Sequence, residues 1–213
     1  MAEVPAEGGK RGPYRTGLRT RDQIIAAASA AFAERGYHGS SLRQIAAAIG
    51  LSPAAILRHF DSKDDLLTAV LEDWTAQTNA IQGQPRPRGL AFWAGQRTVM
   101  EFHTRHLGLL ALFIVLAGEA TAPDHPANPF MVPRYEAVAR GYADALLEAA
   151  ADGEIAPLTS ADALREARHL VAFMDGIEVQ ALLNPDVDLV AEMEAYLSQT
   201  LTRLGGTYVP PQA

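Results

Sequence analysis

The sequence predicts an all-α protein, with a small group of short helices near the N-terminus and a larger helical bundle behind it. Apolar residues recur at helical spacing through most of the chain, and no segment sustains the alternation of apolar and polar residues that marks a strand. Glycines, prolines and Ser or Asp capping residues divide this pattern into separate helical segments. We therefore expect helices packed on helices, without a sheet.

Composition narrows the class of protein further. The chain has 213 residues, of which 48% are hydrophobic and 20% charged, which is typical of a globular protein. It has no cysteine, which excludes disulfides, cysteine-ligated zinc, iron–sulfur clusters and thiol nucleophiles. The longest apolar run, residues 107–118, is shorter than the roughly 20 residues that a bilayer core needs, so we expect a buried helix there. No signal peptide is evident, and we expect a cytoplasmic protein without a membrane partner.

Charge is divided unevenly along the chain. The net charge is −7, but residues 1–60 hold eight Lys or Arg against four acidic residues, a balance of +4, which leaves −11 for the remainder. A basic end on an acidic body suggests a polyanion partner at that end only. The alternative is a solvated basic face that has no partner.

The N-terminal end is predicted to be an arm followed by a first helix. Residues 1–18 are rich in glycine, proline and charge, and we expect them to be disordered. Thr20 and Gln23 have the spacing of a capping box, which predicts that the helix starts there. Apolar residues follow at helical spacing as far as Phe32, and Gly36 ends the helix.

Three further helical segments with strong start and stop signals come next, of which the first two are short. Ser52 caps the second of them and Pro53 occupies its first helical position, where the missing N–H costs nothing. Ser62 and Asp65 have capping-box spacing at the start of the third. The predicted helices cover residues 42–49, 53–60 and 62–82.

A proline-rich break separates these segments from the rest of the chain. The prolines in residues 83–89 cannot continue a helix, because they lack the backbone donor and clash with the preceding turn. A second proline-rich loop is predicted over residues 121–133. The helices expected beyond the first break cover residues 90–106, 107–120, 134–152, 161–183 and 188–204.

The junction between the second and third helices is typical of a helix-turn-helix. Gly50 allows the turn, Leu51 anchors it, and Ser52 caps the next helix. In such units the second helix lies in the major groove and its N-terminal residues face the base edges. The alternative is a small three-helix core with a solvated polar face. The spacing predicts that Ile56 and Phe60 point inward and that the outward residues are Ser52, Pro53, Ala55 and Arg58.

A longer series of motifs carries a resemblance to a known family. In order, the chain contains Gly36-Tyr37, Ser40-Ser41-Leu42, Ile45-Ala46, Gly50-Leu51-Ser52 and His59-Phe60-x-Ser62-Lys63. Residues 20–67, nearly a quarter of the chain, resemble the N-terminal domain of TetR-family transcriptional regulators without a gap. The resemblance implies a DNA-binding three-helix head, a helical C-terminal domain that dimerises and usually binds a small ligand, and repression of nearby genes.

The resemblance also implies which residues contact DNA. Serine hydroxyls, His59, Lys63 and helix N-termini would anchor phosphates. Arg43 and Arg58 would read guanine or clamp a phosphate, the alternative for each being a solvated surface arginine. Arg15, Arg19 and Arg21 would form an arm in the minor groove. The predicted DNA-binding set is Arg21, Ser40, Ser41, Arg43, Ser52, Pro53, Ala55, Leu57, Arg58, His59 and Lys63.

Two positions depart from the family pattern. The family generally has Gly where this chain has Ala54, and Tyr where it has Leu57. The tyrosine hydroxyl of relatives bonds a phosphate, and a leucine cannot do so. Leu57 could instead pack inward, and phosphate anchoring would then rest on the remaining set.

The C-terminal part is the divergent half of the family, so its predicted roles rest on analogy. The last two helices would form a four-helix seam with the partner's copies, the alternative being intramolecular core. Their apolar faces carry Leu164, Val171, Met174, Ile177, Leu189, Met193, Tyr196, Leu197, Thr200 and Leu204.

A ligand pocket is predicted where aromatic and Met residues gather, although such residues also build plain core. A ligand there would act on the head through the helix over 62–82, by pushing on Trp74 or Leu71. The predicted pocket residues are Trp74, Trp93, Met100, His103, Phe113, Phe130, Tyr135 and Phe173.

Catalytic and metal chemistry finds little support in the sequence. There is no Ser-His-Asp order, no Gly-rich phosphate loop and no defensible carboxylate pair. His103, His106 and His125 could ligate a metal, but no Glu or Asp completes a facing set. We therefore expect no metal, no cofactor and no enzymatic activity.

These features predict a dimeric repressor that binds a palindromic double-stranded DNA operator and is released by a small, largely apolar effector. Two alternatives stay open: an activator or architectural DNA binder without an inducer, and a helical enzyme or carrier whose head is vestigial. The predicted domains are a basic arm (1–18), a helix-turn-helix domain (19–66), a ligand-binding and dimerisation domain (67–205) and a C-terminal tail (206–213).

Overall fold

The computed structural model describes residues 13–83 and 85–211, with side chains from residue 18 onward. This part of the chain is helical and has no strand, which confirms the all-α class. The helices are α1 (Pro13–Arg35), α2 (Leu42–Ala48), α3 (Pro53–Ile56), α4 (Lys63–Ile81), α5 (Gly89–Ala94), α6 (Gln96–Arg105), α7 (Leu107–Glu119), α8 (Asn128–Ala151), α9 (Ser160–Leu183) and α10 (Leu189–Arg203).

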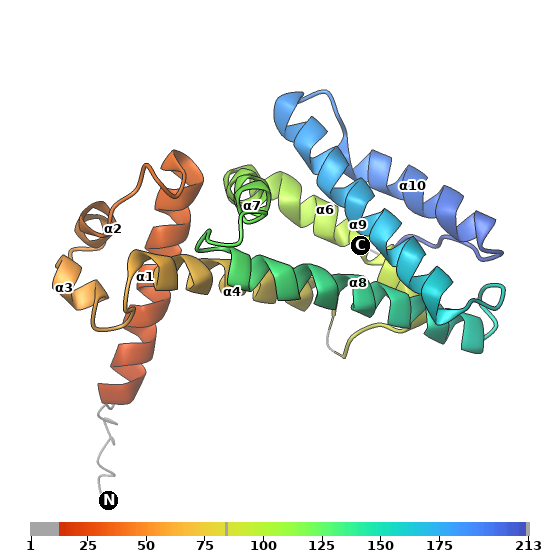
Figure 1. Cartoon of the computed structure of the whole chain (residues 1–213), viewed down its shortest axis with the longest axis horizontal. Helices are drawn as coiled ribbons and strands as arrows, with labels where there is room; N and C mark the ends of the chain where they lie inside the picture. The colour runs from red at the N-terminus through yellow and green to blue at the C-terminus, as the bar shows by residue number, and fades with distance from the viewer. Residues whose placement is uncertain (1–12, 84, 212–213) are drawn as a thin grey trace, which may run out of the picture.

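Helices α1–α3 form a small head at one end of the molecule, and α4 leads from it into the body (Figure 1). The head closes around apolar side chains that are at most 1% exposed, including Ile24, Phe32, Ile45 and Ile56. Burial of such side chains is the main term that stabilises helices as short as α2 and α3, because short helices are marginal in water by themselves.

The turn between α2 and α3 depends on Gly50. Its φ of +68° lies in the left-handed region, which residues with a Cβ rarely adopt. The Leu51 amide then donates to the Ala46 carbonyl at 2.9 Å, and the Ser52 hydroxyl accepts from the Ala55 amide at 3.2 Å. Pro53 occupies the first helical position, so the predicted helix-turn-helix junction is confirmed.

The first helix is longer than the sequence predicts. Because α1 begins at Pro13, residues 13–18 are helical rather than disordered, and Thr20 lies inside the helix rather than at its start. The predicted capping-box start is therefore wrong. Pro13 suits the first helical position because its fixed φ is already helical. The remainder of the predicted arm, residues 1–12, lies outside the described residues.

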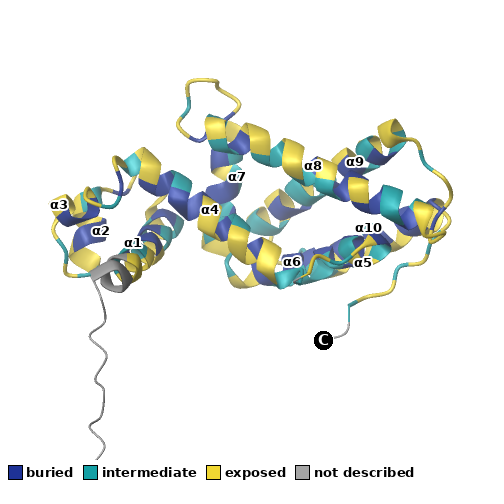
Figure 2. Ribbon diagram, turned by 90° about the horizontal axis from the view of Figure 1, so that it is seen from below, coloured by how far each residue is buried: buried dark blue, intermediate teal, exposed yellow. Residues whose placement is uncertain are grey.

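In the body, α8 and α9 lie against each other, and α10 packs on both α9 and α6. Helices α5 and α6 complete this layer, while α7 packs between α1 of the head and α9. Buried residues lie on the facing sides of these helices and exposed residues on their outer sides (Figure 2). The body is thus a bundle, and α7 is the helix of the body that packs against α1 of the head.

Two apolar cores hold the described part of the chain together. The second core lies wholly in the body and includes Trp93, Leu146 and Leu197. The first core begins in the head with Phe32 and continues through α4 to Phe113 of α7 and Met131 of α8. Head and body therefore share one core, and α4 belongs to both of them.

Several helix boundaries differ from the prediction. The helix expected over 90–106 is two helices that meet at Gly95, a poor helix former. The third helix ends at Ile56, and residues 57–59 form a turn. Helix α8 starts six residues early, at Asn128, and contains Pro133. Burial of the neighbouring apolar residues on α8 offsets the hydrogen bond that this proline removes.

The residues predicted to face a dimer partner mostly face the body's own core. Ile177, Leu189, Met193, Leu197, Thr200 and Leu204 are all buried within one chain. Leu164, Val171, Met174 and Tyr196 are half-buried. The intramolecular alternative is therefore correct for the buried group, because the apolar stripe of each terminal helix is the side that closes the bundle.

Helix α7 is only partly the buried helix that its apolar run predicts. Leu110 and Phe113 are buried, but Leu107 and Val115 are 47% and 56% exposed. Among the described residues, no single helix is long and apolar enough to span a membrane. Only the segments Gly89–Arg105 and Leu107–Glu119 taken together reach that length and composition, and a bend of 104° separates them.

Candidate nucleic-acid interface and ligand cavity

The outward face of α3 differs by one residue from the predicted face. Ser52, Pro53 and Arg58 are exposed, as expected. Ala55, predicted to point outward, is only 7% exposed, whereas Leu57 is 48% exposed rather than packed inward. Successive helical residues turn by about 100°, so the burial of Ala55 beside Ile56 leaves Ala54, Leu57 and Arg58 on the free side.

The two serines before α2 have different roles. Ser40 is buried and its hydroxyl donates to the Ala31 and Gly36 carbonyls at 3.0 and 2.9 Å, so it fastens the end of α1 and does not face a phosphate. That predicted contact is wrong. Ser41 is exposed and caps α2, accepting from the Gln44 amide while the Gln44 side chain accepts from the Ser41 amide. Ser41 thus sets the direction of α2.

Two arginines lie on the surface of the helix-turn-helix. Arg43 on α2 and Arg58 after α3 are both exposed. Within the described residues neither of them has a hydrogen bond or an ion pair. Their guanidinium groups are therefore available for a base edge or a phosphate. His59, between them and α4, is half-buried.

Two further cations of the head lie on aromatic rings. The Arg21 guanidinium is 5.0 Å from the centre of the Phe60 ring, and the Lys63 ammonium is 4.1 Å from the centre of the Tyr37 ring. Partial burial lowers the pKa of Lys63. The Tyr37 hydroxyl in turn donates to Asp64. These contacts fix the two charges at the edge of the head, where the flexible stems would otherwise swing freely.

The predicted minor-groove arm is only partly described. Arg15 and Arg19 are both within α1, Arg19 is exposed, and nothing is described of the Arg15 side chain. The two residues therefore extend the head as helix rather than as a flexible strand of chain.

A cavity of about 810 Å³ lies in the body between α4, α6, α7, α8 and α9. Its size is within the range of sites that hold drug-sized molecules. Five of the predicted pocket residues line it, namely Trp74, His103, Phe113, Phe130 and Tyr135. The sequence therefore identified four of the six Phe, Tyr and Trp residues in the wall and missed Phe92 and Tyr142.

Three predicted pocket residues lie elsewhere. Trp93 is fully buried in the second core, where its indole N–H donates to the Tyr142 carbonyl at 3.0 Å. Met100 is also fully buried there. Phe173 stacks on Tyr196 of α10, with ring centres 4.1 Å apart. Helical spacing explains the error at Met100, because the cavity side of α6 carries Gln96, Val99 and His103 instead.

The sequence does not predict the charged residues in the cavity wall. Arg134 lies over the Phe113 ring at 4.4 Å, and its Nε donates to the Thr75 hydroxyl at 3.3 Å. Burial lowers the pKa of Arg134. On α9, Asp175 and Glu178 line the same cavity. A charged residue on an amphipathic helix is predicted to face water, and no sequence signal marked these three as inward.

The Tyr135–Asp175 pair separates this cavity from a second, mostly apolar hollow. The Tyr135 hydroxyl donates to the Asp175 carboxylate at 3.0 Å, and both residues line both spaces. Burial raises the pKa of Asp175 to about 6, against the opposing effect of the Tyr135 hydrogen bond. Burial likewise raises the pKa of Tyr135.

A buried carboxylate orients His103. Its Nδ1 lies 2.7 Å from the Glu178 carboxylate, and its ring stacks on Trp74 with centres 5.2 Å apart and an interplanar angle of 20°. His103 and Glu178 are 6% and 3% exposed. The contact joins α6 to α9 and fixes the plane of the imidazole at the cavity wall.

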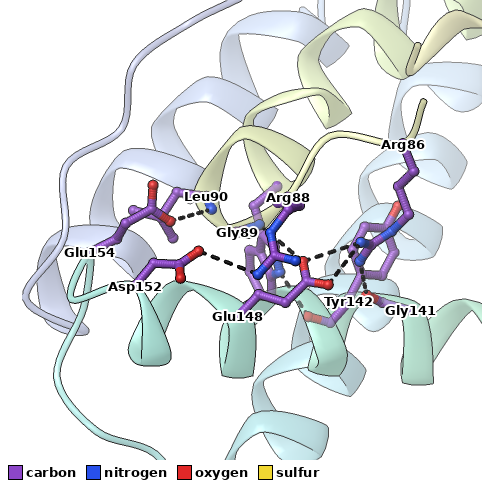
Figure 3. A network of polar contacts seen from close by, with 10 residues as sticks. Arg86, Arg88, Gly89, Leu90, Gly141, Tyr142, Glu148, Asp152 and Glu154 are labelled. Atoms are coloured by element: carbon purple, nitrogen blue, oxygen red, sulfur yellow. Dashed lines mark hydrogen bonds and ion pairs between the residues drawn. The ribbon is translucent and has the colours of Figure 1, made fainter. Parts of the chain in front are cut away.

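The segment between α4 and α5 is held against α8 by polar contacts (Figure 3). Arg86 lies over the Phe92 ring at 4.1 Å, contacts Glu148 at 3.2 Å and donates to the Gly141 carbonyl at 3.0 Å. Burial by itself would raise the pKa of Glu148, but hydrogen bonds from the Gly89 amide and Arg86 outweigh it, so that pKa is lowered. The segment therefore anchors the C-terminal end of α4.

The third histidine considered for metal binding meets a different partner set. His103 and His106 do not join His125, which instead lies with His38 and Glu119, their ligand atoms within 4.8 Å of one another. His125 Nδ1 accepts from the Ala127 amide at 3.2 Å, so Nε2 carries the hydrogen and faces Glu119 at 3.3 Å. A metal-bound histidine donates from its second nitrogen. This geometry favours polar contacts of Glu119 with His125 and with His38 of the head over metal ligation.

The known proteins that are similar to this chain fall into two groups: some match the head alone, and others match both head and body. Residues 24–70 match the family described as bacterial regulatory proteins, tetR family. The transcriptional activator FasR of Mycolicibacterium smegmatis is 40% identical over 68 residues, 32% of this chain and 31% of FasR. The chain therefore spans about a third of that relative.

Two other proteins match over most of their length. The transcriptional regulator TtgR of Pseudomonas putida is 27% identical over 197 residues, 87% of this chain and 91% of TtgR. SmeT, the repressor of the Stenotrophomonas maltophilia multidrug efflux pump SmeDEF, has been solved in complex with triclosan. That structure is 23% identical, covers 92% of this chain and 98% of SmeT, and has a TM-score of 0.75. The family match identifies the head as that of a TetR-family transcriptional regulator, and the likeness to SmeT shows that head and body together have the same fold.

Proposed function

We propose that this regulator is a ligand-responsive repressor that binds a palindromic operator as a homodimer in the cytoplasm. The observation that carries the proposal is the course of α4. Its first residue is Lys63, at the edge of the head, and Leu66 and Leu67 are buried in the head core. Later residues of the same helix, including Trp74 and Thr78, line the cavity. One rigid element therefore links the DNA-facing end to the ligand-facing end.

Release requires that the ligand bind one head orientation more tightly than the other. A ligand in the cavity would contact Trp74 and displace α4 near its middle, because Arg86 and Glu148 fasten the segment after its C-terminal end. The displacement would then appear at the end that carries Lys63. This route supports repression relieved by ligand, as does the repressor role of SmeT.

The proposed DNA contacts follow the exposed side of the helix-turn-helix. Arg58 and Arg43 would grip guanine or phosphate, Lys63 would contact phosphate, and the α3 N-terminus at Ser52 would face the backbone. Leu57, which is exposed, would contact an apolar group such as a thymine methyl. Ala55 and Ser40 have no part in this set, because both are buried.

The proposed dimer face is the outer side of α9 and α10. Small exposed residues occur there at helical spacing, namely Ala172, Gly176, Ala191, Ala195 and Ser198. Small side chains allow two helix pairs to approach closely in a four-helix seam. A two-fold axis through this seam would present two α3 helices to successive major grooves about 34 Å apart.

The test is a selection of bound duplexes from a random pool with the full chain, followed by gel shifts and transcription from a template that carries the selected site. A palindromic consensus, binding by a dimer in ultracentrifugation and reduced transcription support the proposal. Enhanced transcription would reassign the protein as an activator. A pool without enrichment would overturn the regulator mechanism proposed here.

A further inference from the structure

Arg134 reaches from α8 to side chains of two other helices. Its Nε donates to the Thr75 hydroxyl of α4 at 3.3 Å, and its guanidinium carbon lies 4.4 Å from the centre of the Phe113 ring of α7. It is half-buried, and it forms no ion pair with any residue that the structure describes. Charged side chains taken out of water are usually paired with the opposite charge, so these two contacts need a reason.

The two contacted helices are those through which the body holds the head. Both α4 and α7 pack on α1, whereas α8 packs mainly on α9 and α5. Trp74, next to Thr75, belongs to the core that head and body share, and so does Phe113. Arg134 therefore joins α8 to both of the helices that lead to α1.

The Thr75 hydroxyl is arranged to accept the contact from Arg134. It donates its own hydrogen to the Leu71 carbonyl at 2.9 Å, one turn earlier in α4, which leaves a lone pair for the Arg134 Nε. Thr78 donates in the same way to the Trp74 carbonyl at 2.9 Å, and its hydroxyl has no other partner in the described part of the chain. The side chains of the two threonines therefore differ by one hydrogen bond, the one from Arg134.

This contact is weak enough to be released. An arginine on a carboxylate makes two strong parallel hydrogen bonds, whereas here one N–H meets a neutral hydroxyl and the remaining charge lies on an aromatic ring. Asp175 and Glu178 attract Arg134. Their carboxylates already contact Tyr135 and His103. Moving α4 away from α8 therefore breaks one hydrogen bond and no ion pair of Arg134.

We propose that Arg134 is a clamp that joins α4 to α8 and so fixes the head in the orientation that binds the operator. The proposal rests on the proposed function, in which the ligand-free protein binds DNA and α4 moves on release. Arg134 and Thr75 both line the cavity, so a ligand between α4 and α8 would part them. Arg134 is a positioning residue, because it acts on DNA through α4.

The first test is a double-mutant cycle of Thr75→Val and Arg134→Met in the full chain, with operator affinity measured by fluorescence anisotropy. Valine keeps the shape of threonine without the acceptor, and methionine keeps a long side chain without the donor. Thr75→Val should weaken binding to the selected operator about fivefold in the wild type and have no effect in the Arg134→Met background, where the hydrogen bond is already absent. Thr75→Ser keeps the acceptor and should restore most of the affinity.

Thr78→Val is the matched control, because Thr78 also lines the cavity but accepts nothing from Arg134. Its effect on operator affinity should be the same in the wild type and in the Arg134→Met background. Equal effects of Thr75→Val in both backgrounds would overturn the clamp, and so would unchanged or higher affinity in Thr75→Val. The comparison of Thr75→Val with Thr75→Ser needs no change at Arg134, so the clamp can fail on that pair even if Arg134→Met does not fold.

A measurement without DNA distinguishes failure of the clamp from failure of the proposed function. In hydrogen exchange followed by mass spectrometry, the α4 amides after Thr75 should exchange about fivefold faster in Thr75→Val than in the wild type or in Thr75→Ser. If no operator is selected, the proposed function fails, and faster exchange still supports the clamp. If an operator is bound but Thr75→Val neither weakens binding nor speeds exchange, the clamp fails and the proposed function stands.

Discussion

In the head, the residues proposed to contact DNA lie on or beside helices of four and seven residues and at the start of α4, and they point outward. The ligand-facing residues of the body point inward from helices of up to 24 residues. The head obtains its shape from local contacts: two serine caps, a glycine turn and a small apolar core. The body obtains its cavity from contacts between distant segments, such as His103 with Glu178. Functional residues can therefore be predicted from a short stretch of sequence only where that same stretch forms the structure that positions them.

The largest expected effect tests whether the two regions are independent. Phe32 is 1% exposed in the core that head and body share, so Phe32→Ala should cost about 3–5 kcal/mol of unfolding free energy. Because that core continues into the body, the whole chain should unfold in one transition. Urea unfolding is followed by circular dichroism and by the fluorescence of Trp74 and Trp93, the two tryptophans of the chain.

The control is Glu34→Ala, an exposed change on the same helix, which should alter stability by less than about 0.5 kcal/mol. A dichroism transition at lower urea than the fluorescence transition would mean that the head unfolds alone, and the shared core would then not couple the two regions.

Next in size is the loss of DNA affinity in Arg58→Ala. If Arg58 reads a guanine, the variant should bind the best site about 1–3 kcal/mol more weakly and tolerate changes at that base pair. Fluorescence anisotropy on specific and random duplexes measures both quantities. Arg105→Ala, an exposed arginine of the body, is the control and should bind normally. An equal loss on both duplexes would make Arg58 a phosphate contact.

Lys63→Ala tests whether Lys63 contacts a phosphate, which positions the protein on DNA, or a base, which reads the sequence. A phosphate contact releases counterions without sensing sequence, so affinity should fall similarly on all duplexes. The slope of log affinity against log salt should become shallower by about one unit. An unchanged slope would leave Lys63 with only its contact to the Tyr37 ring.

A smaller effect is expected where the two regions touch. A Cβ on Gly108 of α7 would lie 3.0 Å from the Ala33 Cβ and 3.3 Å from the Ala33 carbonyl oxygen, whereas a Cβ on Gly118 of the same helix meets nothing within 4 Å. Gly118→Ala should therefore stabilise the protein by up to about 1 kcal/mol through helix propensity. In Gly108→Ala the same stabilisation should be cancelled, because the added methyl group overpacks α7 against α1.

Thermal unfolding and DNA binding of both variants check this pair. Only Gly108→Ala should change operator affinity, because only that position sets the spacing of head and body. A change of equal size in Gly118→Ala would indicate that helix stability, not spacing, controls DNA binding.

The smallest expected effect is a dependence of stability on pH that arises from Asp175 in the body. The pKa of Asp175 is about 6 in the fold against 3.8 for a free aspartate side chain, so the folded state binds more protons between the two values. Stability should therefore fall as pH rises from about 4 to about 6 and then level off. In Asp175→Asn this contribution should be absent, while Asp144→Asn, an exposed change on α8, should keep it. Urea midpoints at several pH values measure the difference, and parallel curves for wild type and Asp175→Asn would contradict it.

The sequence predicts features that depend on neighbouring residues better than features that depend on tertiary packing. The start of α3 at Pro53 and the stop at Gly50 were predicted correctly because a cap and a turn depend on neighbours within four residues. The start of α1 was wrong because two start signals, Pro13 and the Thr20 box, compete and local rules do not rank them. The side of α3 was misjudged by one residue at Ala55, since the burial of so short a helix is decided by what it packs against.

By itself, the sequence determined the all-α class, the helix-turn-helix junction, the family of the head and most of the aromatic wall of the cavity, because each of these depends on periodicity, caps or residue type within a short window. Only the tertiary structure decided that Gln96, Arg134, Asp175 and Glu178 face inward, that Trp93 does not, and that head and body share a core. The physical reason is that a polar side chain can be buried only where a distant segment supplies its partner, and no local pattern records that partner.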